Sequence, residues 1–387
     1  MKKRFLAVLL SAVMALELTP FTGMAQTYEK TEDIPIGTPD ENVVKIPWAD
    51  RLVETPELQI PASQEMWEVQ RANIRDMVID TLGNVPPRPE TVQCQIYETG
   101  DTPILTYEKF YLDNGYGDMV PGTIYIPKGL TEKAPAILYL HYHGDEFETG
   151  QNELLFSWPL AESGQPLLDK FIERGYVVMA IDAYAFTTRG GMGPGYVPGT
   201  DEKETGLAEE ASLYKFLTVQ GISYMGMIIR DDQIALDYLT TRPEIDPERI
   251  GVTGMSMGGT RANWLSALDE RVKATVSVAC LTRMQDFIRT GNIKWHAFFN
   301  WVPGMLAKFD TESVVSLIAP RPYMQLMGDS DIGSPVEGVR YIQQKMEQVY
   351  KLYGASDNVE FHYYQGLDHD YLPEEFELML SYFDSHL

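Results

Sequence analysis

The hydrophobic and polar positions of this chain follow two different periods. Short apolar runs of strand length recur, and between them lie longer segments whose apolar residues return at helical spacing. The runs that predict strands lie at 105–112, 122–126, 136–140, 176–181, 250–253, 275–279, 323–327 and 359–364. Strands that alternate with helices predict an α/β fold with right-handed crossovers, in which helices cover both faces of a mostly parallel eight-stranded sheet.

A helix of its own precedes the strands. Ser63 marks its start and Gly83 its end, and apolar residues from Trp67 to Leu82 return on one face. The region before it is rich in Pro, Asp and Glu and predicts an extended segment at 26–62. We therefore expect one domain at 63–387, with a helical extension at its amino-terminal end.

Two connections between predicted elements are too long to be plain loops. The first, at about 187–221, begins with a glycine-rich stretch, and the second, at about 283–313, is rich in aromatic residues. Long structured connections in compact domains are usually binding elements. We therefore treat both as inserts that border a binding site.

The first residues have the pattern of a secretory signal peptide. Lysines and an arginine come first, an apolar stretch follows, and Gly23-Met-Ala25 supplies the small residues of a cleavage site. Glu17 interrupts the apolar stretch, which leaves it too short to span a bilayer. We predict a signal peptide at 1–25, cleavage after Ala25, and a mature protein that is periplasmic or secreted.

The acidic charge of the chain argues against some classes of binding partner. A formal net charge of -25 at pH 7 repels nucleic acid and anionic membranes. We therefore expect neither a nucleic-acid partner nor membrane insertion; composition gives no indication of the oligomeric state. The two cysteines, Cys94 and Cys280, lie in strand-like surroundings and are interpreted as small buried residues that are not bridged.

The strongest chemical signal is the pentapeptide Gly254-Met-Ser-Met-Gly258, which lies between a predicted strand and a predicted helix. In a nucleophile elbow, the glycines two before and two after the serine are needed because the backbone is pinched there. The serine hydroxyl then stands clear of the sheet edge. The context predicts that Ser256 is a nucleophile and not part of an ordinary glycine-rich turn.

A nucleophilic serine in this kind of sheet needs an acid and then a base later in the chain. His369 lies on the loop between the last strand and the last helix and is predicted to be the general base, whereas His362 is interpreted as a packed strand residue. Two aspartates follow the strand at 323–327. We choose Asp331 as the acid, and Asp329 as the residue that caps the turn through its side chain.

The oxyanion of an acyl-transfer reaction needs two hydrogen-bond donors. The backbone amide of Met257, at the start of the helix, is one. His143 and Gly144, after the strand at 136–140, are the predicted backbone suppliers of the other, with the Tyr142 hydroxyl as a further candidate. The imidazoles of His141 and His143 could instead form a metal pair, but no ligand cluster lies nearby in sequence, so we predict neither metal nor cofactor.

Two groups of residues are further candidates for the substrate pocket: aromatic-insert residues and arginines. Trp295 and His296 lie in the aromatic insert, where a sugar ring or an acyl group could stack, although the same aromatics would serve a small satellite core. Arg189 in the glycine-rich insert, or Arg261 or Arg283, could recognise a uronate carboxylate, but surface ion pairing is the simpler interpretation.

Taken together, these motifs resemble the α/β-hydrolase superfamily over roughly residues 65–387. Within it the chain is most similar to the dienelactone-hydrolase-like and acetyl-xylan-esterase-like group of secreted bacterial enzymes. The stretches that carry the likeness are 67–83, 120–127, 138–144, 254–259, 267–274, 318–322, 328–335 and 366–369. The chain departs from the common pattern at His141-Tyr-His-Gly and at the two methionines, Met255 and Met257, that flank the serine.

The resemblance implies ester hydrolysis through an acyl-enzyme, often of acyl groups on plant polysaccharides such as acetyl-xylan. The expected substrate is therefore a carbohydrate ester or a small-molecule ester. Two alternatives stay open: a serine peptidase of the prolyl-oligopeptidase kind, which shares the elbow and the order of the triad, and a glucuronoyl or pectic ester hydrolase. A non-catalytic carbohydrate-binding relative would be expected to lack one of Ser256, Asp331 and His369.

Overall fold

The computed structural model describes residues 47–156 and 166–387, and the compact unit from Pro47 to Leu387 is considered by itself. The predicted signal peptide and the first part of the predicted extended segment lie outside the described residues. The last part of that segment, from Leu52 to Pro61, is irregular and leads into helix α1 (Gln64–Leu82). Ser63 caps α1, since its side chain accepts a hydrogen bond from the amide of Met66.

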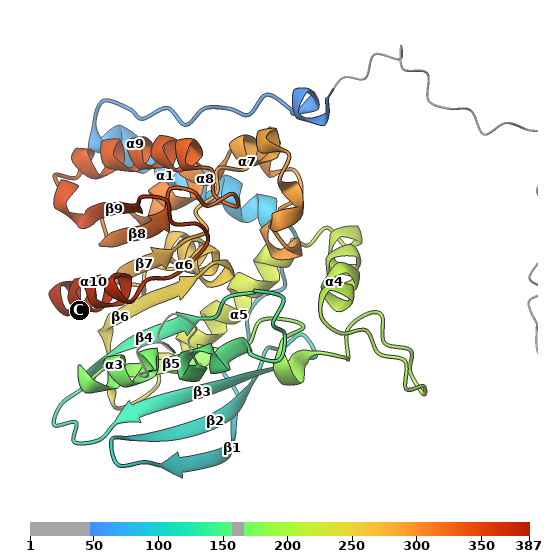
Figure 1. The fold of residues 1–387 in the computed structure, drawn as a ribbon, viewed down its shortest axis with the longest axis vertical. Coiled ribbons are helices and arrows are strands. Elements are labelled where there is room, and N and C mark those ends of the chain that lie inside the picture. The colour runs from blue at the N-terminus through green and yellow to red at the C-terminus, as the bar shows by residue number, and fades with distance from the viewer. Residues whose placement is uncertain (1–46, 157–165) are drawn as a thin grey trace, which may run out of the picture. The chain divides into compact units, whose positions relative to one another are not determined.

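The strands form a single sheet in the order β1-β2-β3-β5-β4-β6-β7-β8-β9, which runs from the bottom to the top of Figure 1. The strands are β1 Cys94–Asp101, β2 Leu105–Asp113, β3 Met119–Pro127, β4 Ala134–Leu140, β5 Val177–Ile181, β6 Ile245–Met255, β7 Ala274–Val278, β8 Tyr323–Gly328 and β9 Val359–Tyr364. The six strands from β4 to β9 are parallel to one another, and β1 to β3 pair antiparallel.

The predicted α/β fold with a mostly parallel sheet is confirmed, but the sheet formed by residues 47–156 and 166–387 has nine strands and not eight. The additional strand is β1, at the edge of the sheet. Its residues are exposed or only partly buried, so the stretch carries no continuous apolar run by which an inner strand is recognised.

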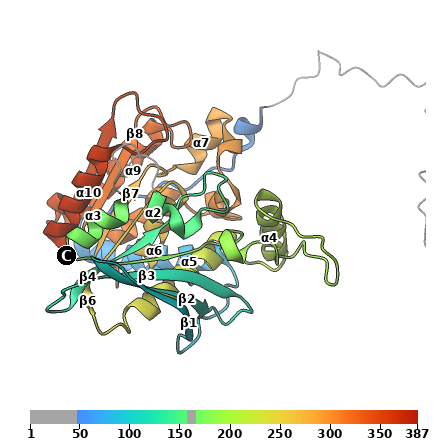
Figure 2. The ribbon, with the colours of Figure 1, turned by 60° about the horizontal axis from the view of Figure 1, so that its bottom comes forward.

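Helices cover both faces of the sheet, and each face has its own cluster of buried apolar residues. One cluster contains residues of α1, α5 (Tyr224–Leu239), α6 (Met257–Leu268) and α9 (Val336–Leu352). The other contains residues of α3 (Leu167–Glu173) and α10 (Pro373–His386), together with Leu154 of α2 (Glu153–Phe156). Figures 1 and 2 show the strands between these two sets of helices.

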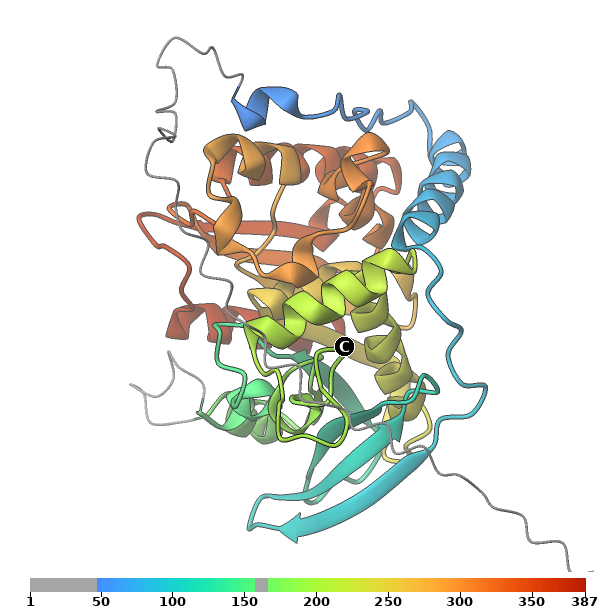
Figure 3. The same cartoon turned by 90° about the vertical axis from the view of Figure 1, so that its right-hand side faces the viewer.

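Both inserts contain elements that the hydrophobic pattern did not indicate. The first holds the 3₁₀ turn η3 (Thr187–Arg189) and helix α4 (Leu207–Val219), which Figure 2 shows on the side opposite the C terminus. The second holds α7 (Met284–Thr290), a series of short 3₁₀ turns and the start of α8 (Thr311–Val315). Helix α4 packs against α5, and Figure 3 shows it beside that helix.

The two cysteines are not bridged. Cys280 is buried, as the sequence predicts, whereas Cys94 is only partly buried, which differs from the prediction. Within residues 47–156 and 166–387, no helix combines the length and the apolar character that crossing a membrane requires. The carboxyl ends of β4, β5, β6 and β8 meet at one edge of the sheet because these strands run in the same direction. Loops that follow different strands are thereby brought together at this edge.

Candidate active site

The turn between β6 and α6 has the geometry of a nucleophile elbow. Ser256 has φ 56° and ψ −118°, a conformation that residues with side chains rarely adopt. A Cβ atom on Gly254 would lie 2.1 Å from the Leu140 carbonyl oxygen, and one on Gly258 would lie 1.9 Å from the same oxygen. Both glycines are therefore required because the end of β4 presses against the turn.

The three residues of the predicted triad come together at the carboxyl edge of the sheet. Nε2 of His369 lies 2.8 Å from the Ser256 hydroxyl oxygen, and Nδ1 of His369 lies 2.7 Å from Oδ2 of Asp331. A carboxylate only accepts hydrogen bonds, so the neutral imidazole carries its proton on Nδ1. Nε2 is then free to accept the proton of the serine.

Asp331 is held rigidly in its loop. Its other oxygen, Oδ1, accepts a hydrogen bond of 2.7 Å from the amide of Gly333. Burial favours the neutral acid, but the hydrogen bond and the charge of His369 outweigh it and lower the pKa of Asp331. Burial in turn opposes the charged form of His369, and Asp331 outweighs this effect and raises the pKa of the imidazole.

The residues that the sequence offered as alternatives make other contacts. Oδ1 of Asp329 accepts a hydrogen bond of 2.7 Å from the amide of Gly366 and so caps the neighbouring turn. His362 lies on β9, and its Nε2 is 3.0 Å from a carboxylate oxygen of Glu360. The geometry therefore favours Asp331 and His369 as the acid and the base.

His296 lies against the loop that carries Asp331, and its role in a substrate pocket stays a prediction. Its Nε2 is 2.6 Å from the carbonyl oxygen of Gly333, and its Nδ1 faces the Cys280 sulfur at 3.8 Å. Burial lowers the pKa of His296, so the neutral ring donates through Nε2–H to the carbonyl. The ring thus braces the loop of Asp331. Trp295 is 56% exposed, with the Lys294 ammonium 5.3 Å from its ring centroid, and its pocket role stays a prediction.

The loop that follows β4 is held by two buried carboxylates. The amide of Tyr142 donates a hydrogen bond of 2.7 Å to Oε2 of Glu153, and Nε2 of His143 lies 2.9 Å from Oε2 of Glu210. The amide of His143 makes no hydrogen bond within the described part of the chain. The amide of His143, a predicted oxyanion donor, is therefore available, whereas the preceding amide of Tyr142, which was not among the predicted donors, is engaged.

The other predicted oxyanion donors differ in whether they are free to bind the oxyanion. Met257 is the first residue of α6, where backbone amides have no partner within the helix. Gly144 has φ 54°, and a Cβ there would lie 2.4 Å from the ring of Tyr142. The Tyr142 hydroxyl donates to Glu146 instead of standing free.

Glu153 and Glu210 were not recognised from the sequence. Glu153 begins the short helix α2, and its other oxygen accepts a hydrogen bond of 2.6 Å from the Tyr139 hydroxyl. Burial raises the pKa of Glu153 to about 8. Glu210 lies on α4, and the Tyr224 hydroxyl also donates to its carboxylate. A glutamate that begins the apolar stretch Glu153-Leu-Leu-Phe was the one available signal.

The contacts of Arg189 favour the ion-pair interpretation over recognition of a uronate carboxylate. Its guanidinium is buried and donates to Asp118 through Nε and Nη2, to Asp231 through Nη2, and to the Asp182 carbonyl through Nη1. These partners leave no charge to recognise an anion. The two other arginines are also paired, Arg261 with Asp232, and Arg283 with Asp286 and Glu312.

The histidine pair after β4 has no free nitrogen for a metal ion. Nε2 of His141 accepts from the amide of Ala183, and its Nδ1 lies 2.7 Å from the Tyr142 carbonyl oxygen. His143 accepts from the amide of Asp145 at Nδ1 and contacts Glu210 at Nε2. In the described ranges, no three His, Cys, Asp or Glu residues are grouped in a way that could hold a metal ion.

Comparison with known proteins places the chain in a family. The sequence profile of the Dienelactone hydrolase family matches residues 162–301. YtaP of Bacillus subtilis (strain 168), provisionally named a hydrolase, is 33% identical over 288 residues, which are 74% of this chain and 90% of YtaP. The chain belongs to the dienelactone hydrolase family. The resemblance inferred from the sequence motifs is thereby confirmed.

Solved structures of other proteins support the fold of this family member. A protein of Bacteroides fragilis NCTC 9343, provisionally named an acetyl xylan esterase, superposes with a TM-score of 0.61 at 19% identity, over 78% of this chain and 76% of that protein. A glucuronoyl esterase of Solibacter usitatus gives a TM-score of 0.62 at 17% identity, over 86% of this chain and 98% of that enzyme. At such low identity these similarities establish the α/β-hydrolase fold alone.

Proposed function

We propose that this protein is a serine esterase that cleaves carboxylic esters of carbohydrates through an acyl-enzyme. The observation that carries the proposal is the chain of contacts from Ser256 through His369 to Asp331, with separations of 2.8 and 2.7 Å, at an elbow whose serine is strained. A hydroxyl within reach of a neutral imidazole, which is itself oriented by a carboxylate, is an activated nucleophile.

In the proposed reaction, Nε2 of His369 takes the proton of Ser256 as its Oγ attacks the ester carbonyl. Asp331 stabilises the imidazolium that forms. The amides of Met257 and His143 stabilise the oxyanion, and the alcohol leaves with the proton from His369. Water, activated by the same imidazole, then attacks the acyl-enzyme and releases the carboxylic acid and the free serine.

The names of similar proteins support a carbohydrate as the alcohol part of the ester. The two structures compared above carry the names of an acetyl xylan esterase and a glucuronoyl esterase. Of these two substrate types, we favour a neutral acetylated glycan. Arg189, Arg261 and Arg283 are all paired with carboxylates, and the chain is strongly acidic, so neither feature favours a uronate.

We also propose that the protein is exported. The support is the order of basic, apolar and small residues before Gln26. Polymeric glycans are met outside the cytoplasm, so export agrees with the proposed substrate. Sequencing of the mature amino terminus tests this point, and a terminus other than Gln26 would contradict the predicted cleavage site.

Labelling and turnover together test the proposed activity. A fluorophosphonate should label the wild-type protein at Ser256, and acetate should be released from acetylated xylan. Ser256→Ala should abolish labelling and lower kcat by about 10⁴-fold or more. If the Ser256→Ala variant keeps most of its turnover of p-nitrophenyl acetate, the assignment of the nucleophile is wrong.

The serine-peptidase alternative is separated by a second set of substrates. Dipeptide naphthylamides and acetylated xylan should be compared at equal enzyme concentration. The proposal expects acetate release and no measurable release of naphthylamine. Faster cleavage of the naphthylamides than of the esters would favour the peptidase.

A further inference from the structure

A cavity lies at the same edge of the sheet as Ser256, beside the first insert. Its volume is about 340 Å³. Its walls come from the turn between β2 and β3, the residues that follow β5, the glycine-rich loop at 189–194, and helices α4 and α5. None of the proposed catalytic residues is among those that line it.

The cavity and Ser256 are on the same side of the sheet because of the strand directions. Tyr184 follows β5, Ser256 follows β6, and both strands run parallel to β4, which separates them. The turn between β2 and β3 reaches the same edge, since β3 is antiparallel to β5 and Gly122 pairs with Ile181. Two strand spacings correspond to about 10 Å along the edge. A short oligosaccharide covers such a span.

Three large apolar side chains on separate segments converge on this cavity and are exposed. They are Tyr116 in the β2–β3 turn, Met192 in the glycine-rich loop, at 66% exposed, and Phe216 on α4, at 45% exposed. Solvent-exposed apolar residues that gather around one hollow usually mark a binding site. The Tyr116 hydroxyl makes no hydrogen bond within the described residues and is therefore available to a ligand.

Polar groups line the same hollow, and together they carry negative charge. Asp118 is partly exposed at the wall, while Arg189 is buried between Asp118 and Asp231 and packs on the ring of Tyr184. Glu209 lies at the base of the glycine-rich loop and accepts hydrogen bonds from its amides. The lining therefore repels anions, and offers carboxylate acceptors beside aromatic rings.

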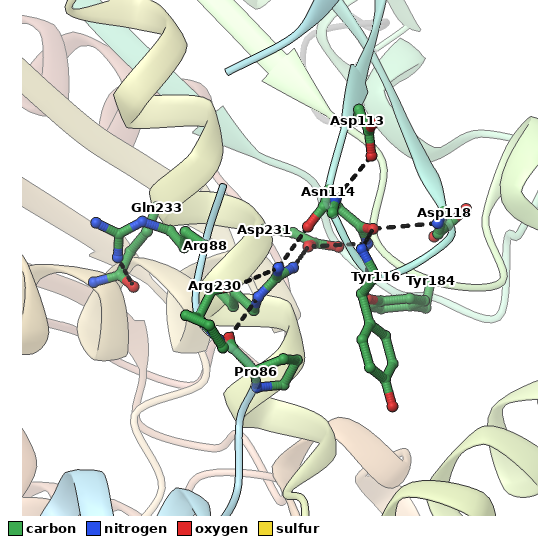
Figure 4. Close-up of polar contacts among 12 residues, drawn as sticks. Pro86, Arg88, Asp113, Asn114, Tyr116, Asp118, Tyr184, Arg230, Asp231 and Gln233 are labelled. Atoms are coloured by element: carbon green, nitrogen blue, oxygen red, sulfur yellow. Dashed lines mark hydrogen bonds and ion pairs between the residues drawn. The ribbon is translucent and has the colours of Figure 1, made fainter. Parts of the chain in front are cut away.

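The wall that carries Tyr116 is held in place by a buried polar cluster. The side chain of Asn114 accepts hydrogen bonds from the amides of Tyr116 and Asp118, and Arg230 donates to the Asn114 carbonyl (Figure 4). Arg230 also donates to the Pro86 carbonyl, which ties the turn to the chain before β1. A turn fixed in this way presents its aromatic side chain at little entropic cost.

From these features we infer that the cavity is a subsite for a sugar ring of a neutral glycan chain, at a distance from the ester being cleaved. A pyranose ring presents an apolar face for stacking on Phe216 or Tyr116 and hydroxyl groups at its edge for Asp118 and the Tyr116 hydroxyl. The inference rests on the proposed esterase function, and it identifies the substrate as an oligomer or a polymer instead of a single acetylated sugar.

Binding of unesterified glycans tests the subsite without catalysis. Xylo-, manno- and cello-pentaose should be titrated by calorimetry into the Ser256→Ala protein, alone and combined with Phe216→Ala or Tyr116→Ala. We expect at least one pentaose to bind, and each aromatic substitution to weaken binding by about 5- to 10-fold. Tyr97→Ala is the matched control, because Tyr97 is an exposed aromatic on β1 at the edge of the sheet.

Turnover provides the second measurement. In the otherwise wild-type enzyme, Phe216→Ala should lower kcat/KM on acetylated oligosaccharides and leave kcat/KM on p-nitrophenyl acetate unchanged, since the small ester does not reach the cavity. The subsite is excluded if none of the three glycans binds, or if Phe216→Ala and Tyr97→Ala behave alike. Glycan binding that depends on Phe216, in a protein that releases no acetate from any glycan, would overturn the esterase proposal and leave the subsite standing.

Discussion

Oδ2 of Asp331 lies 2.7 Å from Nδ1 of His369, and the two groups differ sharply in exposure. The carboxylate side chain is 1% exposed, whereas the imidazole is 35% exposed. The buried charge is compensated by His369 and by the Gly333 amide, and Nε2 of the imidazole faces the Ser256 hydroxyl. A carboxylate in this position fixes the tautomer of the base and stabilises its charged form.

The first prediction concerns Asp331→Asn. The amide cannot stabilise the imidazolium, so kcat on p-nitrophenyl acetate should fall by about 10⁴-fold. The pKa of His369 should also fall, because Asp331 is what raises it. The measurement is a pH–kcat profile of both proteins. Asp329→Asn, at the neighbouring turn, is the matched control and should retain activity; the reverse outcome would make Asp329 the acid.

The wild-type enzyme should show the corresponding pH dependence. The general base must be neutral, and the pKa of His369 is raised above its ordinary value, so kcat/KM should fall as the pH drops through that raised pKa. Asp331 stays ionised in this range, since its own pKa is lowered. An acid limb that lies below the ordinary histidine range would contradict the coupling of the two residues.

Replacing a glycine of the elbow should destabilise the protein through a steric clash. A Cβ at Gly258 meets the Leu140 carbonyl oxygen at 1.9 Å, and that backbone cannot move without displacing β4. Gly258→Ala should therefore lower the free energy of unfolding by about 3 kcal/mol and displace Ser256 from His369. Gly354→Ala is the control, since Gly354 has positive φ but open space around it, and should cost about 1 kcal/mol. Urea denaturation measures both values. If the two variants lose the same free energy of unfolding, the predicted clash at Gly258 is contradicted.

The sequence was sufficient to predict eight of the nine strands of the described sheet and to select the three residues of the proposed triad, and the reasons are local. The turn from Gly254 to Gly258 leaves no room for side chains at its two glycines, so the motif is recognisable from the sequence. The strand that precedes it carries a continuous apolar run. The order of serine, acid and base then left few histidines and aspartates from which to choose. These features depend on short stretches of chain and on the general direction of parallel strands.

Other features depend on contacts between distant segments and left no local signal. β1 is recognisable only by its pairing with β2. For Arg189 the sequence favoured an ion pair at the surface, but it could not indicate that the partners are Asp118 and Asp231 or that the pair is buried. His296 was placed in the pocket because it lies among aromatics, although its ring turns toward the loop of Asp331. Glu210 meets His143 across 67 positions of sequence, which no spacing rule anticipates.

Glu210 leads to a prediction about the oxyanion loop. Glu210→Ala would leave the buried Nε2–H of His143 and the Tyr224 hydroxyl without their acceptor. The loop that carries the His143 amide should loosen, and kcat should fall by about 10²-fold with little change in KM. Glu210→Gln, which keeps an acceptor oxygen, should recover part of this loss. Ser212→Ala, on the same helix, should have no effect on kcat, and unchanged kcat in Glu210→Ala would show that the loop is held without it.

Glu153 makes stability depend on pH. Burial raises the pKa of this carboxyl to about 8, against about 4.5 in the unfolded chain. Between these values the folded protein holds a proton that the unfolded chain has released, so its contribution to the free energy of unfolding falls as the pH rises from about 4.5 to about 8. A shift of this size corresponds to a change on the order of 5 kcal/mol across that window.

Glu153→Gln should therefore flatten the pH dependence of stability. The amide resembles the protonated carboxyl, since its oxygen can accept from the Tyr142 amide and its nitrogen can donate to the Tyr139 hydroxyl. The variant should match the wild type at pH 5, where both side chains are neutral, and should be more stable at pH 8. Urea denaturation at pH 5, 6.5 and 8 measures the difference, with Glu374→Gln, at the exposed start of α10, as the control. If the two variants depart from the wild type by the same amount at every pH, the Glu153 carboxyl is already ionised in the folded protein.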